Sequence, residues 1–148
     1  MNFVDWYKKR GLRFILKRAQ KLRERYSFSP GRSITRIRAC VDELSAHGCY
    51  PTFFVPGIVA KRNPEFIHEL QDRGCEIGVH GYQHIDMRSI PPQEANQQLI
   101  RALEAFKEES LESYGFRCPY LSVSDDLINN LEPGIFNYSS NRAIAWVD

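Results

Sequence analysis

The sequence predicts an α/β fold built on a parallel sheet or barrel. Short apolar segments alternate with stretches whose apolar residues recur at helical spacing, and this alternation is typical of parallel sheets. Proline and glycine stand at the borders of most of these segments. The 148 residues are 43% hydrophobic and contain no low-complexity tract, which is sufficient for one domain with a real core.

The first 25 residues form a basic arm. They carry nine Lys and Arg residues against Asp5 and Glu24, a net charge of +7, whereas residues 26–148 sum to −5. Helix formers predominate, but arginines interrupt the apolar face, so we expect a helix of ragged amphipathicity. A solvated charged helix is the favoured interpretation, and a helix bound to an anionic membrane surface or partner is the alternative. Because the positive charge is confined to the arm, we expect no nucleic-acid partner for the folded domain.

The next elements follow from local signals. Residues 26–31 end in Pro-Gly and predict a short strand leading into a turn. Ser33 is expected to cap a helix that ends at His47-Gly48. Residues 52–55 are a compact apolar strand closed by Pro-Gly.

The alternation then continues to the end of the chain. The helix over 64–73 has a proline in its first turn and Gly74 as its stop, and the short helix over 125–131 has Ser124 near its cap. The remaining predicted elements are a strand over 76–79, a long helix starting at Pro91-Pro92, a strand over 115–117 and a final strand over 143–147.

The cysteines and the apolar runs bear on the compartment. The four cysteines fall in no CxxC spacing, so we expect free buried thiols in a reducing cytosol rather than a zinc-cysteine site or disulfides. No apolar run approaches the roughly 20 residues of a membrane span or the core of a signal peptide. A cytoplasmic protein is expected, with peripheral contact at the inner membrane face through residues 1–25 as a further interpretation. The cysteines are Cys40, Cys49, Cys75 and Cys118.

Two segments at strand ends carry candidate chemistry. His80 and His84 follow the strand over 76–79 directly, where a turn can direct both imidazoles at one metal, although two histidines four apart are more often incidental. Arg117 lies at the end of the strand that begins at Gly115 and could bind or orient a carboxylate, with a surface ion pair as the simpler interpretation. Cys118 has no acid–base partner nearby in the sequence and is interpreted as a packing residue.

In combination, these segments resemble the polysaccharide deacetylases, the family that contains the nodulation-factor and chitooligosaccharide deacetylase homology domain. The order and the gaps of several motifs match over residues 26–148, which we take as one deacetylase-like domain after the arm. The matching segments are Thr52-Phe53-Phe54-Val55-Pro56-Gly57, Asn63-Pro64-Glu65, Gly74 through His84, Arg117-Cys118-Pro119-Tyr120 and Ala145-Trp146-Val147-Asp148.

This resemblance implies a distorted (β/α) barrel and a metal-dependent hydrolase that removes acetyl groups from an N-acetylated or O-acetylated carbohydrate. His80 and His84 match the histidine ligands of a divalent, zinc-type ion. Arg117 matches the residue that orients the general base, and the backbone N–H of Tyr120 matches the donor to the oxyanion. Three further residues are placed with the substrate: Trp146 as the apolar wall for the acetyl methyl group, Tyr82 and Ser29.

Two departures from the family pattern define the alternative. Ser29 and Pro30 stand where the first motif, T-F-D-D-G, has its two aspartates, so a substitute carboxylate is expected from Asp86, Asp125 or Asp148. The chain also ends before a Leu-x-x-His segment, so we expect an incomplete barrel whose open edge invites a partner chain or a second copy. The alternative function is therefore a catalytically inactive relative that binds a carbohydrate or a partner.

Overall fold

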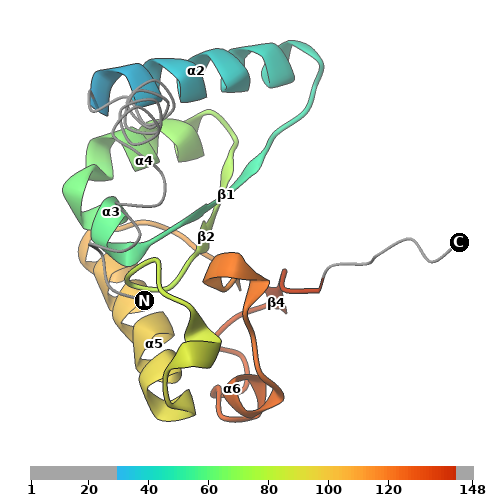
Figure 1. The fold of residues 1–148 in the computed structure, drawn as a ribbon. Coiled ribbons are helices and arrows are strands. Elements are labelled where there is room, and N and C mark those ends of the chain that lie inside the picture. Colours follow the sequence, from blue (N-terminus) through green and yellow to red (C-terminus); the bar gives the residue numbers. More distant parts are fainter. Residues whose placement is uncertain (1–29, 143–148) are drawn as a thin grey trace, which may run out of the picture. The chain divides into compact units, whose positions relative to one another are not determined.

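A computed structural model describes residues 30–142 of the chain (Figure 1). The chain divides into two units, Met1–His47 and Gly48–Asp148. The basic arm, most of the strand expected over 26–31, the final strand over 143–147, and the candidate residues Ser29, Trp146 and Asp148 lie outside the described residues.

In the first unit, the described element is the helix α2, Pro30–Ala46. Ser33 lies inside this helix rather than at its cap, and Pro30 and Gly31 are helical rather than extended, so both predictions are wrong. The physical reason is that proline is well tolerated in the first helical turn, where its missing N–H would have no acceptor. The predicted end of the helix is confirmed, because Gly48 takes a positive φ of 69° directly after His47.

The second unit is built on a four-stranded sheet in the order β1-β2-β3-β4, with every neighbouring pair parallel. The strands are β1 Thr52–Val55, β2 Glu76–Val79, β3 Gly115–Phe116 and β4 Tyr138–Ser139. The predicted parallel α/β fold is thus confirmed. The described sheet is open, with β1 and β4 at its edges, so a closed or distorted barrel stays a prediction.

Helices connect the strands. The unit contains α3 Gly57–Arg62, α4 Pro64–Asp72, α5 Pro92–Glu108 and α6 Asp125–Asn129, with the short 3-10 turns η1 Met87–Ser89 and η2 Pro119–Leu121. Ser124 accepts a hydrogen bond from the N–H of Leu127 at 3.2 Å and caps α6 as predicted. The additional helix α3 was not predicted, because Pro56-Gly57 reads as a turn and the six residues of α3, which begin at Gly57, are too few to show a helical period.

One face of the sheet is buried beneath helices. Ile77, Val79 and Phe116 point into this core, and Leu99 and Phe106 of α5 fill it with at most 1% of their surface exposed. Helix α5 packs on both α3 and β2. None of the described helices has the length and apolarity needed to cross a bilayer.

On the opposite face, two aromatic rings lie over glycines. A Cβ on Gly78 would fall 2.6 Å from the Phe54 ring, and one on Gly115 would fall 2.1 Å from Cζ of Tyr138. Glu76 accepts hydrogen bonds from the hydroxyls of Thr52 at 2.7 Å and Tyr138 at 2.6 Å, which links β1, β2 and β4 across this face. Because a Cβ on Gly78 or Gly115 would overlap these rings, both positions need glycine.

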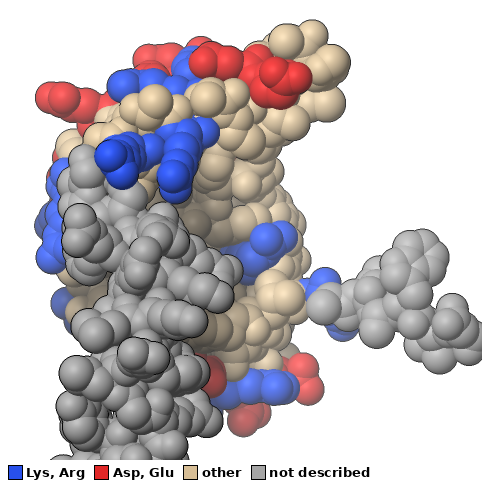
Figure 2. Space-filling view, turned by 45° about the horizontal axis from the view of Figure 1, so that its top comes forward, with Lys and Arg blue, Asp and Glu red and all other residues tan. Residues whose placement is uncertain are grey.

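The cysteine prediction is half correct. Cys75 and Cys118 are buried, whereas Cys40 and Cys49 are exposed, and no disulfide joins any of the four, all of which lie in the described part. Cys40 neighbours Val41 in α2 and so takes a different face of that helix, and Cys49 lies in the loop after α2. Figure 2 shows Lys and Arg side chains in several separate groups on the face that it draws.

Candidate active site

The candidate residues gather where three neighbouring parallel strands end. His80 follows Val79 of β2, Arg117 follows Phe116 of β3, and Ser140 follows Ser139 of β4. Because the carboxyl ends of parallel strands meet at one edge of a sheet, residues far apart in sequence come together there. His80 and Arg117 therefore lie at the carboxyl ends of parallel strands, where the sequence predicted the candidate residues.

His80 is held from two sides. Its N–H donates to the carbonyl of Val55 at 3.0 Å, which extends the β1–β2 pairing by one residue. Its Nδ1 lies 2.6 Å from the carbonyl oxygen of Arg117. A carbonyl can only accept, so Nδ1 carries the proton, and the neutral ring keeps a lone pair on Nε2.

The environment of His80 favours this neutral form. Burial lowers the pKa of His80 below its ordinary value of 6.5, the hydrogen bond to the Arg117 carbonyl opposes that shift, and the charges of His84 and Arg117 add to it. A neutral imidazole is the form that ligates metals. His80 therefore remains available as a ligand to more acidic pH than an exposed histidine does.

His84 returns to His80 through a tight turn. Gly81 has a φ of 70°, a conformation that favours glycine, and a Cβ there would also force the terminal methyl group of Met87, 2.6 Å away, to move. The two imidazole centroids are 5.0 Å apart with their planes at 60°. The exposed ring of His84 also meets the Tyr120 ring edge-on, with 4.8 Å between centroids.

Arg117 is anchored to the segment after β4. Its Nε donates to the carbonyl of Ser140 at 2.9 Å and its Nη2 to the Ser140 hydroxyl at 2.6 Å. Its Cζ lies 4.4 Å from the centre of the Phe54 ring. Within the part of the chain that the structure describes, Arg117 has no carboxylate partner, so its role in orienting a general base remains a prediction.

Tyr120 lies in a strained turn. Tyr120 and Leu121 have φ angles of 59° and 56°, a region that residues other than glycine occupy at an energetic cost and that concentrates at functional sites. The Tyr120 side chain is 70% exposed. Among the hydrogen bonds of residues 30–142, none uses the N–H of Tyr120, so this donor is available to a ligand.

Sequence reasoning missed Ser140 and Asn141. Asn141 is only 6% exposed, its Oδ1 accepts the N–H of Cys118 at 2.7 Å, and its Nδ2 donates to the hydroxyl of Ser139 at 3.2 Å. The polar run Ser139-Ser140-Asn141 at the end of a strand is the signal that could have found them, had the two-residue strand β4 been recognised.

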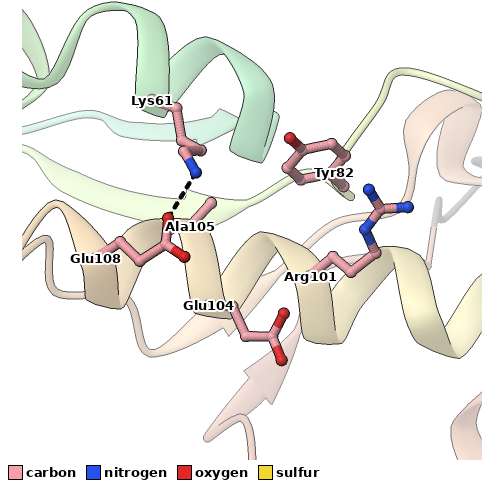
Figure 3. A pocket seen from close by; sticks show the side chains of 6 residues that line it. All are labelled: Lys61, Tyr82, Arg101, Glu104, Ala105 and Glu108. Carbon is pink, nitrogen blue, oxygen red and sulfur yellow. Dashed lines mark hydrogen bonds and ion pairs between the residues drawn. The ribbon is translucent and has the colours of Figure 1, made fainter.

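Tyr82 points into a different space from the two histidines that flank it in the sequence. It lines a pocket of about 170 Å³, together with residues of α3 and α5 (Figure 3). Lys61 and Glu108 form an ion pair at 2.6 Å in this pocket, and Cζ of Arg101 lies 4.7 Å from the centre of the Tyr82 ring. Neither His80 nor His84 lines it, so contact between Tyr82 and a substrate stays a prediction.

The histidine pair fits a divalent metal as two nitrogen ligands, since Nε2 of His80 keeps a lone pair that can bind a metal and lies in a ring beside that of His84. In residues 30–142, no third His, Cys, Asp or Glu joins them in a metal-holding group. Asp86 and Asp125 therefore do not complete the site. Asp86 instead accepts hydrogen bonds from the Arg88 N–H at 3.0 Å and from the Ser122 hydroxyl, and Asp125 lies in the first turn of α6.

The site lies within a segment of known type. Residues 31–133 match the model of the polysaccharide deacetylase family. The chain belongs to this family. The match includes His80, His84 and Arg117, which the sequence motifs assigned to the same family.

Curated proteins with deacetylase names match part of this chain. It is 32% identical over 93 residues to the peptidoglycan deacetylase-like protein FGM2 of Gibberella zeae, covering 61% of this chain and 27% of that protein. It is 30% identical over 90 residues to the chitooligosaccharide deacetylase of Sinorhizobium fredii, covering 60% of this chain and 42% of that protein. The chain thus spans less than half the length of these two curated relatives.

The fold is shared with solved structures. A CE4 family pseudoenzyme from Bacillus anthracis superposes with a TM-score of 0.63 at 22% identity, over 76% of this chain and 39% of that one. This family member therefore carries part of the deacetylase fold.

Proposed function

We propose that this chain removes acetyl groups from an N-acetylated carbohydrate in a reaction that depends on a divalent metal. The observation that carries the proposal is the pair His80 and His84 at the end of β2, with Nδ1 of His80 committed to the carbonyl of Arg117. The names of the two curated relatives, a chitooligosaccharide deacetylase and a peptidoglycan deacetylase-like protein, support an acetylated carbohydrate as substrate.

His80 and His84 would hold the metal through ring nitrogens, and zinc is a common choice for imidazole ligands. When bound, such an ion polarises a carbonyl oxygen and lowers the pKa of a water molecule. Its remaining ligand would come from outside residues 30–142 or from the substrate.

The residues of the second loop would act on the acetyl group. The N–H of Tyr120, which no group in the described part accepts, would donate to the oxygen that becomes negative as the amide carbonyl is attacked. The guanidinium of Arg117 is held between Ser140 and the Phe54 ring, so it can orient a carboxylate without moving. Trp146 would provide the apolar wall for the acetyl methyl group, and Ser29 a polar contact to the substrate.

Acetate release tests this proposal. The full chain would be incubated with N-acetylated chitooligosaccharides and with peptidoglycan fragments, with added zinc or with a chelator. We expect acetate release that the chelator and the His80→Ala and His84→Ala variants abolish. His47→Ala is the matched control, since His47 lies after α2 and is exposed, and it should retain the wild-type rate.

A non-catalytic carbohydrate-binding role is the second candidate. Ser29 and Pro30 provide neither carboxylate of the first family motif, and residues 30–142 provide two metal ligands rather than three. The structural neighbour from Bacillus anthracis is itself described as a pseudoenzyme. Binding of an acetylated oligosaccharide without acetate release would establish this role. The double variant Ser29→Asp, Pro30→Asp should then acquire metal-dependent turnover.

A further inference from the structure

One peptide group connects the candidate metal ligand to a buried asparagine. The peptide unit between Arg117 and Cys118 is used at both of its polar ends. Its carbonyl oxygen accepts the Nδ1 proton of His80 at 2.6 Å, and its N–H donates to Oδ1 of Asn141 at 2.7 Å. Because a peptide group is planar, the directions of its C=O and N–H cannot change independently.

Asn141 is itself fixed in place. It is buried, and its Nδ2 donates to the hydroxyl of Ser139 in β4. The N–H of Ser140 donates to the carbonyl of Phe116 at 2.9 Å, which ties the segment after β4 to the end of β3. Cys118 is completely buried, so its N–H has no access to water as a substitute acceptor.

We propose that Asn141 is a positioning residue that sets the tautomer and ring orientation of His80 through the Arg117–Cys118 peptide. Accepting the Cys118 N–H fixes the plane of this peptide and makes its carbonyl a stronger acceptor, since chains of hydrogen bonds polarise one another. The carbonyl then holds the proton on Nδ1 of His80 and leaves Nε2 open. This inference rests on the proposed function in so far as Nε2 serves a metal.

Ser140 has a separate task and provides the matched control. It accepts hydrogen bonds from the guanidinium of Arg117 through its carbonyl and its hydroxyl, whereas the two hydrogen bonds of the Arg117–Cys118 peptide described above go to His80 and Asn141. Ser140→Ala therefore removes a side-chain contact from the same segment and leaves the Asn141–peptide–His80 chain intact. A purely structural role for the segment would make both variants behave alike.

The test measures the imidazole nitrogens of His80 directly. In the metal-free full chain, ¹⁵N spectra assigned with a His80→Gln variant should show Nδ1 protonated and Nε2 unprotonated. Asn141→Ala leaves the Cys118 N–H without its acceptor, so we expect a mixture of the two tautomers and a zinc affinity lower by about 10- to 100-fold, the usual effect of removing a group that orients a ligand. Asn141→Asp keeps an acceptor oxygen and should recover most of both signals, and Ser140→Ala should preserve them.

The outcomes separate this proposal from the proposed function. A wild-type His80 protonated on Nε2, or an Asn141→Ala chain with the wild-type tautomer and zinc affinity, would overturn the positioning role. If Asn141→Ala does not fold, the wild-type tautomer and its retention in Asn141→Asp decide the question. If the wild type releases no acetate while the tautomer depends on Asn141 as expected, the positioning role stands and only the proposed function fails.

Discussion

Substituting Gly115 by alanine should destabilise the protein where Gly115 of β3 pairs with Tyr138 of β4. A Cβ at this position would fall 2.1 Å from Cζ and 2.3 Å from Cε1 of Tyr138, whereas carbon atoms pack comfortably at about 3.5–4.0 Å. The ring must therefore move by well over an ångström. The hydroxyl of Tyr138 donates to Glu76 at 2.6 Å, and a displaced ring cannot keep that hydrogen bond.

The expected cost follows from these two effects. Overpacking costs about 1–3 kcal/mol, and a lost hydrogen bond about 0.5–1.5 kcal/mol. Alanine recovers about 0.4–1 kcal/mol by reducing the entropy of the unfolded chain. We therefore expect a net destabilisation of about 2 kcal/mol, which lowers the Tm of a chain of this length by about 4–8 °C.

Thermal and urea unfolding followed by circular dichroism measure this loss. The control background is Tyr138→Ala, in which the ring atoms that the methyl group would overlap are absent. In that background, Gly115→Ala should cost less than about 0.5 kcal/mol, so the double-mutant cycle shows a large coupling. Equal destabilisation by Gly115→Ala in both backgrounds would refute the steric reasoning.

Three further predictions follow from single residues. Because burial lowers the pKa of His80 below 6.5, the unfolded chain binds a proton at this residue before the folded chain does. The free energy of unfolding should therefore fall as the pH decreases from 6.5 through the lower pKa of the folded state. Urea titrations across this pH range should show no such fall in His80→Asn, and an equal fall in that variant would exclude His80 as its source. Ser124→Ala removes the cap on α6 and should cost about 1 kcal/mol, whereas Ser124→Asp should be close to neutral; an equal loss in both variants would contradict the capping role. Burial raises the pKa of the Cys118 thiol to about 12, and Cys75 is buried as well, whereas Cys40 and Cys49 are exposed. Ellman's reagent should therefore modify two thiols rapidly in the native protein, Cys40 and Cys49, and all four in denaturant. Four rapid modifications in the native protein would argue against the described packing.

Local sequence signals were sufficient for most of the fold. The strands Thr52–Val55 and Glu76–Val79 are short apolar runs bounded by proline or glycine, and α5 has a proline start and a sustained helical period. The same reasoning placed His80 and His84 at a strand end, because the residue after a buried strand emerges at the edge of the sheet. These predictions depend only on neighbours along the chain.

The amino-acid sequence by itself thus determined the alternating strands and helices, the family, and the two histidines as candidate ligands. Only the tertiary structure decided that Asn141 and Ser140 hold Cys118 and Arg117, each pair 23 residues apart. It also decided that Tyr82 faces α3 and α5 instead of the histidines beside it. The physical reason is that these contacts depend on the pairing of β3 with β4, and strands of two residues are too short to show a period in the sequence.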